Sequence, residues 1–223
     1  MINTLLVKKY DTPQLNKKEI LRYMGCKESS AEVLALVEDC IDELAPKLTY
    51  KVCYRSFDIE VSTDIADLSF MTTNSKDLIK NLSDCKKIVL FAATIGLEPD
   101  RLIARYGRTS PSKALCFQAI GAERIESLCN AFNDEITKDC LAEGLFTRPR
   151  FSPGYGDFSL ESQKSIFDVL DCNRKIGLSL NESLLMSPSK SVSALIGISS
   201  IKKDCHSGTC AQCEKFDCSF REE

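Results

Sequence analysis

Ile88-Val-Leu-Phe-Ala-Ala93 is a short apolar run without a polar interruption, and it consists mainly of residues that favour strands. A half-exposed strand alternates apolar and polar residues, whereas an uninterrupted run is typical of a strand buried on both faces. We therefore predict a central strand that other elements cover on both sides. Gly96 follows closely and is expected to turn the chain.

The strongest helical pattern comes after this strand. Ser110 and Pro111 have the composition of a helix start, and apolar residues at helical spacing continue to Gly144. This segment is predicted to be the longest helix.

Two shorter helices are predicted before the strand. Asn16 and Glu19 form a capping-box pattern ahead of an apolar stripe that stops at Gly25. The same pattern starts again at Ser29, and its stripe continues to Pro46. Helices are therefore expected on both sides of the central strand in the sequence.

Alternating patterns predict the remaining strands. Residues 48–54 and 57–61 alternate apolar and polar side chains, as two strands or one broken strand would. After a helix predicted at 159–172, residues 178–186 and 191–198 have strand composition and are joined by a Ser-Pro-Ser-Lys turn. The sequence thus predicts a mixed fold of helices and strands.

The composition is that of a globular protein without a strong charge bias. Hydrophobic residues make up 43% and charged residues 27% of the 223 positions, and 29 Lys and Arg stand against 32 Asp and Glu. This near-balance of charges creates no strong positive electrostatic field that would attract nucleic acid or an anionic membrane as the main partner. No apolar run is long enough to span a bilayer, and residues 1–10 lack the pattern of a signal peptide, so we expect a cytoplasmic protein.

The twelve cysteines fall into two groups. Eight are scattered, and three of these, Cys116, Cys129 and Cys140, lie in the long helical pattern, where a free cysteine packs as a small apolar residue. The other four are crowded into the last nineteen residues. In a reducing compartment such a cluster indicates a metal site more than disulfides.

The clustered cysteines have a spacing that suits one metal centre. They form the pattern C-x4-C-x2-C-x4-C, in which Gly208 lets the backbone wrap tightly. Zinc would stabilise a tail too small to fold alone, and an iron–sulfur cluster would bind equally well and could carry electrons. The spacing does not choose between these metals, and a flexible reduced tail is the alternative. The predicted ligands are Cys205, Cys210, Cys213 and Cys218.

Prolines and glycines dominate residues 147–156 and prevent regular structure there. Within this segment, Arg150-Phe-Ser-Pro-Gly-Tyr155 resembles the Arg-Pro-x-Pro-Gly-Tyr loop of the activation domain of cobalamin-dependent methionine synthase. The similarity continues in order through the next helix to Ser191-Val-Ser193 and covers roughly residues 88–200.

Two features depart from the family's pattern. Phe151 and Gly156 stand where the family has prolines, which concerns the path of the loop more than the identity of its ligand. Asp204-x-His206-x-Gly208 is only similar to the Asp-x-His-x-x-Gly motif of cobalamin-carrying modules, since its glycine comes one place early and no α/β module follows. We do not expect this segment to bind a corrin.

The resemblance implies an α+β fold, namely a C-shaped domain with a twisted antiparallel sheet flanked by helices. We expect this domain to occupy residues 1–200, and residues 201–223 to form the cysteine-rich tail.

The resemblance also implies a site for S-adenosylmethionine. Arg150 would pair with the ligand's carboxylate, because a planar guanidinium matches a carboxylate bidentately, and Glu126 would serve the cationic end. Pro153 and Gly154 would shape a backbone edge for the adenosine, and Tyr155 would lie where ligand and corrin meet. Glu143 is a weaker acidic candidate.

The implied function is that of an accessory protein in the reductive remethylation of cobalamin. The cobalamin would be carried by a separate methionine synthase that lacks its own activation domain, and a flavodoxin or ferredoxin would donate the electron. Holding the methyl donor beside the cobalt would accelerate the transfer by proximity, without a catalytic acid or base. The alternatives are a reductive activator of another corrinoid methyltransferase that uses an iron–sulfur tail, or a non-catalytic module that binds S-adenosylmethionine or a corrinoid protein.

Overall fold

The predicted central strand lies in the middle of a five-stranded antiparallel sheet. A computed structural model describes residues 4–26 and 30–203 and arranges the strands in the order β1-β2-β6-β10-β7. The strands are β1 (Leu6–Tyr10), β2 (Tyr50–Asp58), β6 (Lys87–Thr94), β7 (Phe146–Thr147) and β10 (Ser191–Ser199). β6 pairs with β2 on one side and with β10 on the other, so it has no free edge.

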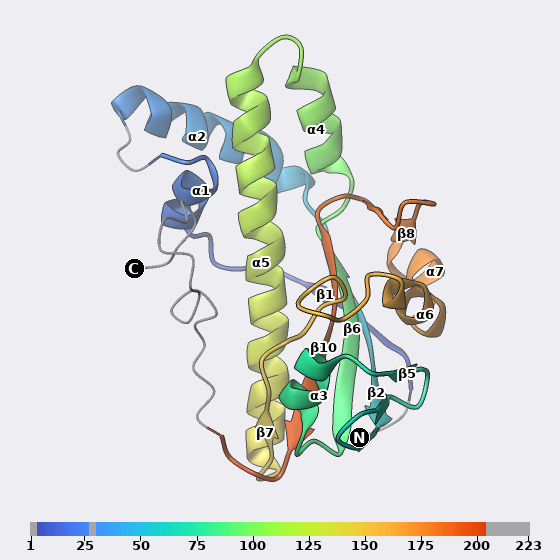
Figure 1. Ribbon diagram of the computed structural model, residues 1–223. Coiled ribbons are helices and arrows are strands. Elements are labelled where there is room, and N and C mark those ends of the chain that lie inside the picture. Colours follow the sequence, from blue (N-terminus) through green and yellow to red (C-terminus); the bar gives the residue numbers. More distant parts are fainter. Residues whose placement is uncertain (1–3, 27–29, 204–223) are drawn as a thin grey trace.

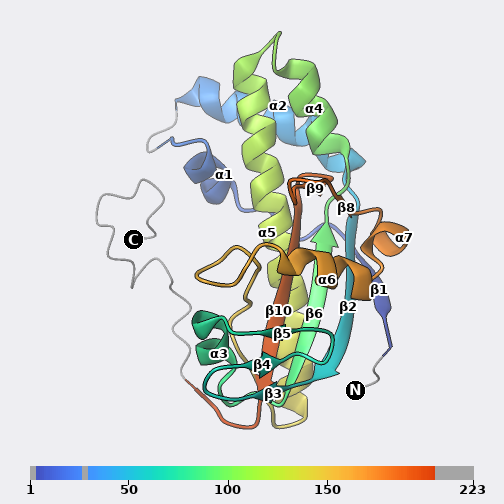
Figure 2. The ribbon, with the colours of Figure 1, turned by 45° about the vertical axis from the view of Figure 1, so that its right-hand side comes forward.

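The side chains of β6 alternate between two hydrophobic cores. Val89 and Phe91 face the long helix α5 (Pro111–Ala142), while Ile88 and Leu90 face the opposite layer. That layer contains α3 (Lys76–Leu82), α6 (Ser162–Val169) and α7 (Cys172–Ile176). Figures 1 and 2 show α5 along one face of the sheet and α6 across the other. Both faces of β6 are therefore buried, as the uninterrupted apolar run predicts.

A third core lies beyond the end of the sheet, where helices pack on the N-terminal half of α5. Phe117 and Ile120 of α5 contact this core, to which Ile20 and Leu44 also belong. The surrounding helices are α1 (Lys17–Tyr23), α2 (Ala31–Leu44) and α4 (Glu98–Tyr106), and a short 3-10 turn, η1 (Ala45–Lys47), ends α2. Because α5 extends past the sheet (Figure 1), it belongs to both the sheet layer and this helical layer.

Two small sheets complete the described part of the chain. One pairs β3 (Glu60–Val61), β4 (Ala66–Asp67) and β5 (Thr72–Thr73), and the other pairs β8 (Ser179–Leu180) with β9 (Met186–Ser187).

The predicted fold class is confirmed for the described residues, which form an α+β domain with a curled antiparallel sheet flanked by helices. The central strand and the longest helix agree with their predictions. The first helix starts at the predicted cap, since the Asn16 side chain accepts from the Glu19 N–H at 3.3 Å. Ser29 lies outside the described residues, and the cap of α2 is Ser30, whose hydroxyl accepts from the Val33 N–H.

The predicted strand at 178–186 and its hairpin with 191–198 are wrong. Only the two ends of 178–186 are extended, and they pair with each other as part of β8 and β9. The side chain of Asn181 accepts from the N–H groups of Ser183 and Leu185, both at 2.9 Å, which favours a turn at this point. β10 pairs instead with β6 and β7.

The helix predicted at 159–172 forms only as the shorter α6, which ends at Val169. Asp171 has the left-handed backbone angle φ 46°, and α7 starts after it, at the last residue of the predicted range. The elements that were not predicted from the sequence include β1, α3, α4 and the short strands β4, β5 and β7. No helix in the described part of the chain is long and apolar enough to cross a membrane.

Candidate functional site

One face of α5 points away from the sheet and carries polar side chains. Glu123, Glu126, Ser127 and Asn130 are spaced by three or four residues, so they lie on the same side of the helix. The sheet-facing side carries apolar residues such as Leu128. The helical period thus places Glu126 among polar neighbours.

Glu126 and Arg150 form an ion pair that joins α5 to the loop after β7. The Arg150 guanidinium donates to the Glu126 carboxylate, and its Nη1 donates to the Asn130 Oδ1 at 3.1 Å. The side chains of Arg150 and Glu126 are 27% and 39% exposed, so both charges remain accessible. The two charged residues predicted as ligand contacts are therefore neighbours, although 24 positions separate them in the sequence.

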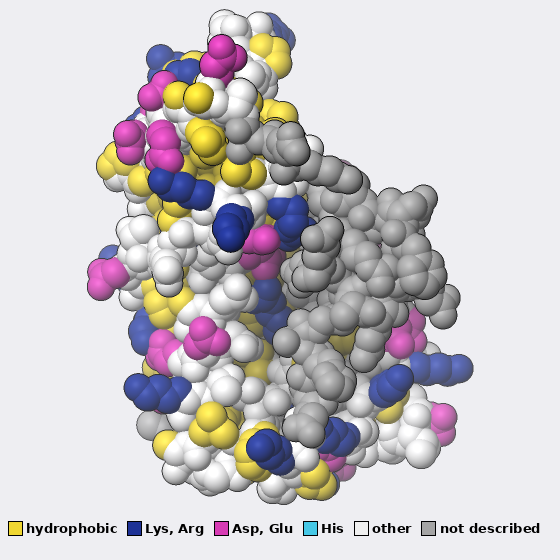
Figure 3. All heavy atoms as spheres, turned by 90° about the vertical axis from the view of Figure 1, so that its left-hand side faces the viewer, with side chains coloured by type: hydrophobic (Ala, Val, Ile, Leu, Met, Phe, Trp, Pro, Cys, Tyr) yellow, Lys and Arg dark blue, Asp and Glu magenta, His cyan; other side chains and the backbone are white. Residues whose placement is uncertain are grey.

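The pair borders a polar cavity of about 490 Å³ between α1, α5 and the loop. Its lining residues are Asn16, Glu19, Arg22, Tyr23, Glu123, Glu126, Ser127, Asn130 and Arg150. A second, open cavity of about 760 Å³ lies alongside, between α5 and residues 13–18. Both volumes fall in the range of small-molecule sites. On the face shown in Figure 3, basic and acidic side chains lie next to one another near the centre.

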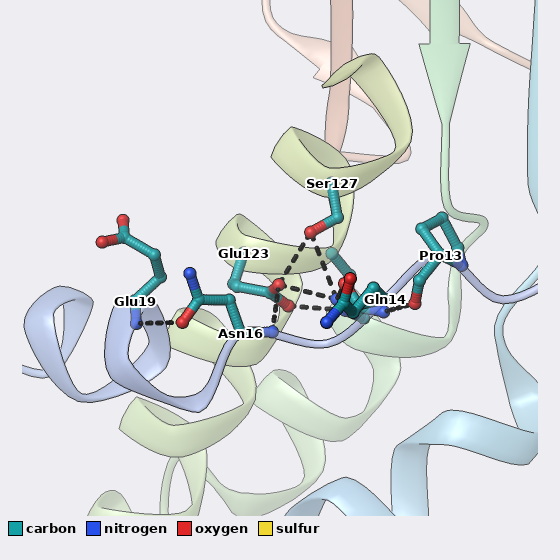
Figure 4. Close-up of polar contacts among 7 residues, drawn as sticks. Pro13, Gln14, Asn16, Glu19, Glu123 and Ser127 are labelled. Carbon is teal, nitrogen blue, oxygen red and sulfur yellow. Dashed lines mark hydrogen bonds and ion pairs between the residues drawn. The ribbon is translucent and has the colours of Figure 1, made fainter. Parts of the chain in front are cut away.

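A buried charge pair holds the N-terminal segment against α5 (Figure 4). Arg124 donates to both carboxylate oxygens of Glu123, at 2.5 and 2.6 Å, and to the carbonyls of Pro13 and Gln14, at 2.7 and 2.8 Å. Glu123 also accepts from the backbone N–H of Asn16 at 2.9 Å. Since Asn16 caps α1, these contacts fix the start of α1 relative to α5.

This network was not predicted from the sequence. Adjacent helical residues point in different directions, so no spacing rule links Glu123 to Arg124. Both side chains are only 2% exposed. The sequence pattern of α5 does not show that these two charged residues are buried.

Tyr23 of α1 is one of the residues that line the cavity. Burial raises the pKa of its hydroxyl, and the negative charge of Glu126 raises it further. α1 therefore contributes a half-buried aromatic side chain close to the predicted acidic residue.

The loop after Arg150 is held by backbone contacts to the sheet. Phe151 and Leu195 exchange two hydrogen bonds of 2.9 Å, and the Gly154 N–H donates to the Phe158 carbonyl at 2.7 Å. Gly154 has φ 86°, a conformation that glycine adopts without strain. The loop thus has a fixed path even with phenylalanine at position 151.

Asp157 ties the same loop to the start of α3. It accepts from the Ser75 hydroxyl and from the N–H groups of Lys76 and Asp77, at 2.7 and 3.2 Å. These hydrogen bonds, first of all the one from Ser75, lower the pKa of the Asp157 carboxyl.

Pro153, Gly154 and Tyr155 are not among the described residues that line the cavity. Pro153 is buried, whereas Tyr155 is 54% exposed and meets the Phe151 ring edge-on, with ring centres 5.4 Å apart. The loop therefore presents Arg150 to the cavity and Tyr155 to the outer surface. Glu143, the weaker acidic candidate, is the exposed C-cap of α5, about 25 Å along the helix from Glu126.

Cys116, Cys129 and Cys140 are buried, as expected for packing residues. Burial raises the pKa of the Cys129 thiol to about 12, which keeps the thiol protonated and unreactive. The predicted metal ligands Cys205, Cys210, Cys213 and Cys218 lie outside the described residues. Within residues 4–26 and 30–203, no group of three or more histidine, cysteine or acidic side chains could hold a metal ion.

Comparison with known proteins identifies relatives of this fold. The crystal structure of the MetH reactivation domain bound to AdoHcy superposes with a TM-score of 0.65 and 15% sequence identity, covering 90% of this chain and 80% of that chain. A search of curated proteins found no match. The family described as vitamin B12 dependent methionine synthase, activation domain, matches residues 69–212, which is more than half of the 223 residues. The chain therefore belongs to the family of the vitamin B12-dependent methionine synthase activation domain.

Proposed function

We propose that this protein binds S-adenosylmethionine at the Glu126–Arg150 cavity and supports the reductive remethylation of cobalamin carried by a separate methionine synthase. The observation that carries the proposal is the accessible ion pair at the wall of a polar cavity. Family membership supports the reaction, and the similar reactivation domain, bound to AdoHcy, supports the class of ligand.

The ion pair suits a zwitterionic headgroup. The ligand's carboxylate would bind Arg150 and its ammonium would bind Glu126, so the internal pair would be exchanged for two pairs with the ligand. Both side chains are partly exposed, which keeps the cost of separating them small compared with that of opening a buried pair. In this arrangement the protein presents both charges at fixed positions before the ligand arrives.

The rest of the loop would serve the other end of the ligand. Pro153 and Gly154 would offer backbone groups to the adenosine, and the exposed ring of Tyr155 would face the partner that carries cobalamin. The partner's reduced cobalamin would accept the methyl group, leaving S-adenosylhomocysteine, and a flavodoxin or ferredoxin would supply the electron. This chain's own contribution would be to bind and orient the methyl donor.

Calorimetric titration of S-adenosylmethionine into the wild type, Arg150→Met and Glu126→Gln, all purified without oxygen, tests the proposal. We expect saturable binding to the wild type and a loss of about 1.5 to 3 kcal/mol in each variant, because each removes a charged hydrogen-bond partner. Arg174→Met is a matched control, since this side chain is 85% exposed and is not one of the residues that line the cavity.

Equal affinity in the wild type and both site variants would place the ligand elsewhere. Binding without stimulation of cobalamin remethylation in a reconstituted methionine synthase would favour the non-catalytic alternative.

A further inference from the structure

The 490 Å³ cavity has a second ion pair, on the wall formed by α1. Arg22 donates from Nε and Nη2 to the Glu19 Oε2, at 3.0 and 2.6 Å. The side chains of Arg22 and Glu19 are 25% and 33% exposed, close to the values for Arg150 and Glu126. One cavity therefore has an accessible acid–base pair on α1 and another on α5 and the loop.

The α1 pair is fixed in orientation by its surroundings. The guanidinium of Arg22 lies over the ring of Tyr23, 4.8 Å from its centre. The start of α1 is held against α5 by the hydrogen bond from the Asn16 N–H to Glu123. The wall that carries Arg22 and Glu19 is thus preorganised relative to Glu126.

We propose that these two ion pairs together form a clamp for an α-amino-acid headgroup, with Arg22 and Glu19 as the second half of the S-adenosylmethionine site. The inference rests on the proposed function and extends it, because it assigns α1 to the site and names the ligand group that the cavity selects. Two guanidinium groups would hold the carboxylate and two carboxylates would hold the ammonium. A ligand with only a carboxylate would leave the two carboxylates of the clamp without a partner, and a ligand with only an ammonium would leave the two guanidinium groups without one.

The clamp predicts which part of the ligand determines affinity. S-adenosylmethionine and S-adenosylhomocysteine share the headgroup, whereas 5′-methylthioadenosine has the same nucleoside without it. The wild type is expected to bind the first two at least about tenfold more tightly than the third, since the loss of charged hydrogen bonds has this effect.

The test compares the binding of these three compounds to the wild type, Arg22→Met, Glu19→Gln and Arg150→Met. We expect Arg22→Met to weaken both headgroup-bearing ligands about tenfold or more and to leave 5′-methylthioadenosine unchanged. Lys18→Met is the matched control, because it removes the same charge from the same helix at a position that lines the neighbouring cavity and not this one. Thermal unfolding of each variant identifies any loss of folding.

The outcomes separate this inference from the proposed function. If Arg150→Met weakens S-adenosylmethionine while Arg22→Met and Glu19→Gln bind as the wild type does, the site stands and the clamp is refuted. If the wild type binds none of the three compounds, the proposed function itself fails. If Lys18→Met weakens binding as much as Arg22→Met, the effect is one of net charge and the clamp is again refuted.

Discussion

Asp84 shows how single polar residues join the loop and the C-terminal end of β10 to the rest of the fold. Burial alone would raise the pKa of its carboxyl, but hydrogen bonds from Lys203, Arg148, Ser199 and Ser83 outweigh burial and hold the pKa far below its usual range. The Arg148 side chain is only 3% exposed and also donates to the Ile201 carbonyl at 2.7 Å. Asp84 is therefore an ionised partner for a buried arginine.

The substitution Asp84→Asn is expected to destabilise the protein by about 3 to 5 kcal/mol at pH 7, because it leaves the buried charge of Arg148 without its counter-ion. The pKa of the Asp84 carboxyl in the folded state lies below its unfolded value of about 3.9. The contribution of Asp84 to stability is therefore complete above the unfolded value and is lost as the pH falls toward the folded pKa. Urea unfolding of the wild type and Asp84→Asn between pH 7 and pH 3 should thus show the difference in their unfolding free energies shrinking below about pH 4. A difference that stays constant over this range would contradict this account.

At the scale of the element, α5 does two things through its different faces. Its apolar side packs on the sheet through residues such as Phe132, and its polar side forms a wall of the cavity with Glu126. Between these sides, Glu123 and Arg124 connect α5 to residues 13–16. A single 32-residue helix thereby links the sheet core to the candidate site.

We expect Arg124→Met to destabilise the protein by about 3 to 5 kcal/mol, because it leaves the Glu123 carboxylate buried without its counter-ion. The double variant Glu123→Gln with Arg124→Met should be less unstable than Arg124→Met alone, since no uncompensated charge remains. Urea unfolding of the wild type, both single variants and the double variant measures this coupling. Strict additivity of the two single effects would argue against a coupled pair.

At the scale of the whole molecule, the candidate cavity draws on elements far apart in the chain. Its described lining residues come from α1, α5 and the loop that begins after β7. The cysteine cluster at 205–218 remains a predicted metal site, for which zinc and an iron–sulfur cluster are the two candidates.

A chain that ends after Lys203 is expected to bind S-adenosylmethionine as the full chain does. The full chain, purified without oxygen, should contain one metal centre, which is lost on truncation or when the four tail cysteines are replaced by serine. Elemental analysis measures the metal, and visible absorbance distinguishes an iron–sulfur cluster from colourless zinc. A full chain without bound metal would overturn the prediction of a metal site.

Local patterns predicted much of the fold. The uninterrupted run at 88–93 indicated a doubly buried strand, and the spacing from Ser110 to Gly144 indicated the longest helix. Such patterns work because a side chain's burial repeats with the period of its own helix or strand. β1 and α4 were missed because their sequences are rich in charged residues and are stabilised by neighbours distant in the chain.

The sequence by itself determined the loop that carries Arg150, the polar face of α5 and the family to which the chain belongs. Only the tertiary structure decided that Arg150 pairs with Glu126, that α1 forms the opposite wall and that Arg124 is buried. The physical reason is that periodicity reports only which side of an element is apolar. The partner of a charged side chain depends on how elements far apart in the sequence pack together.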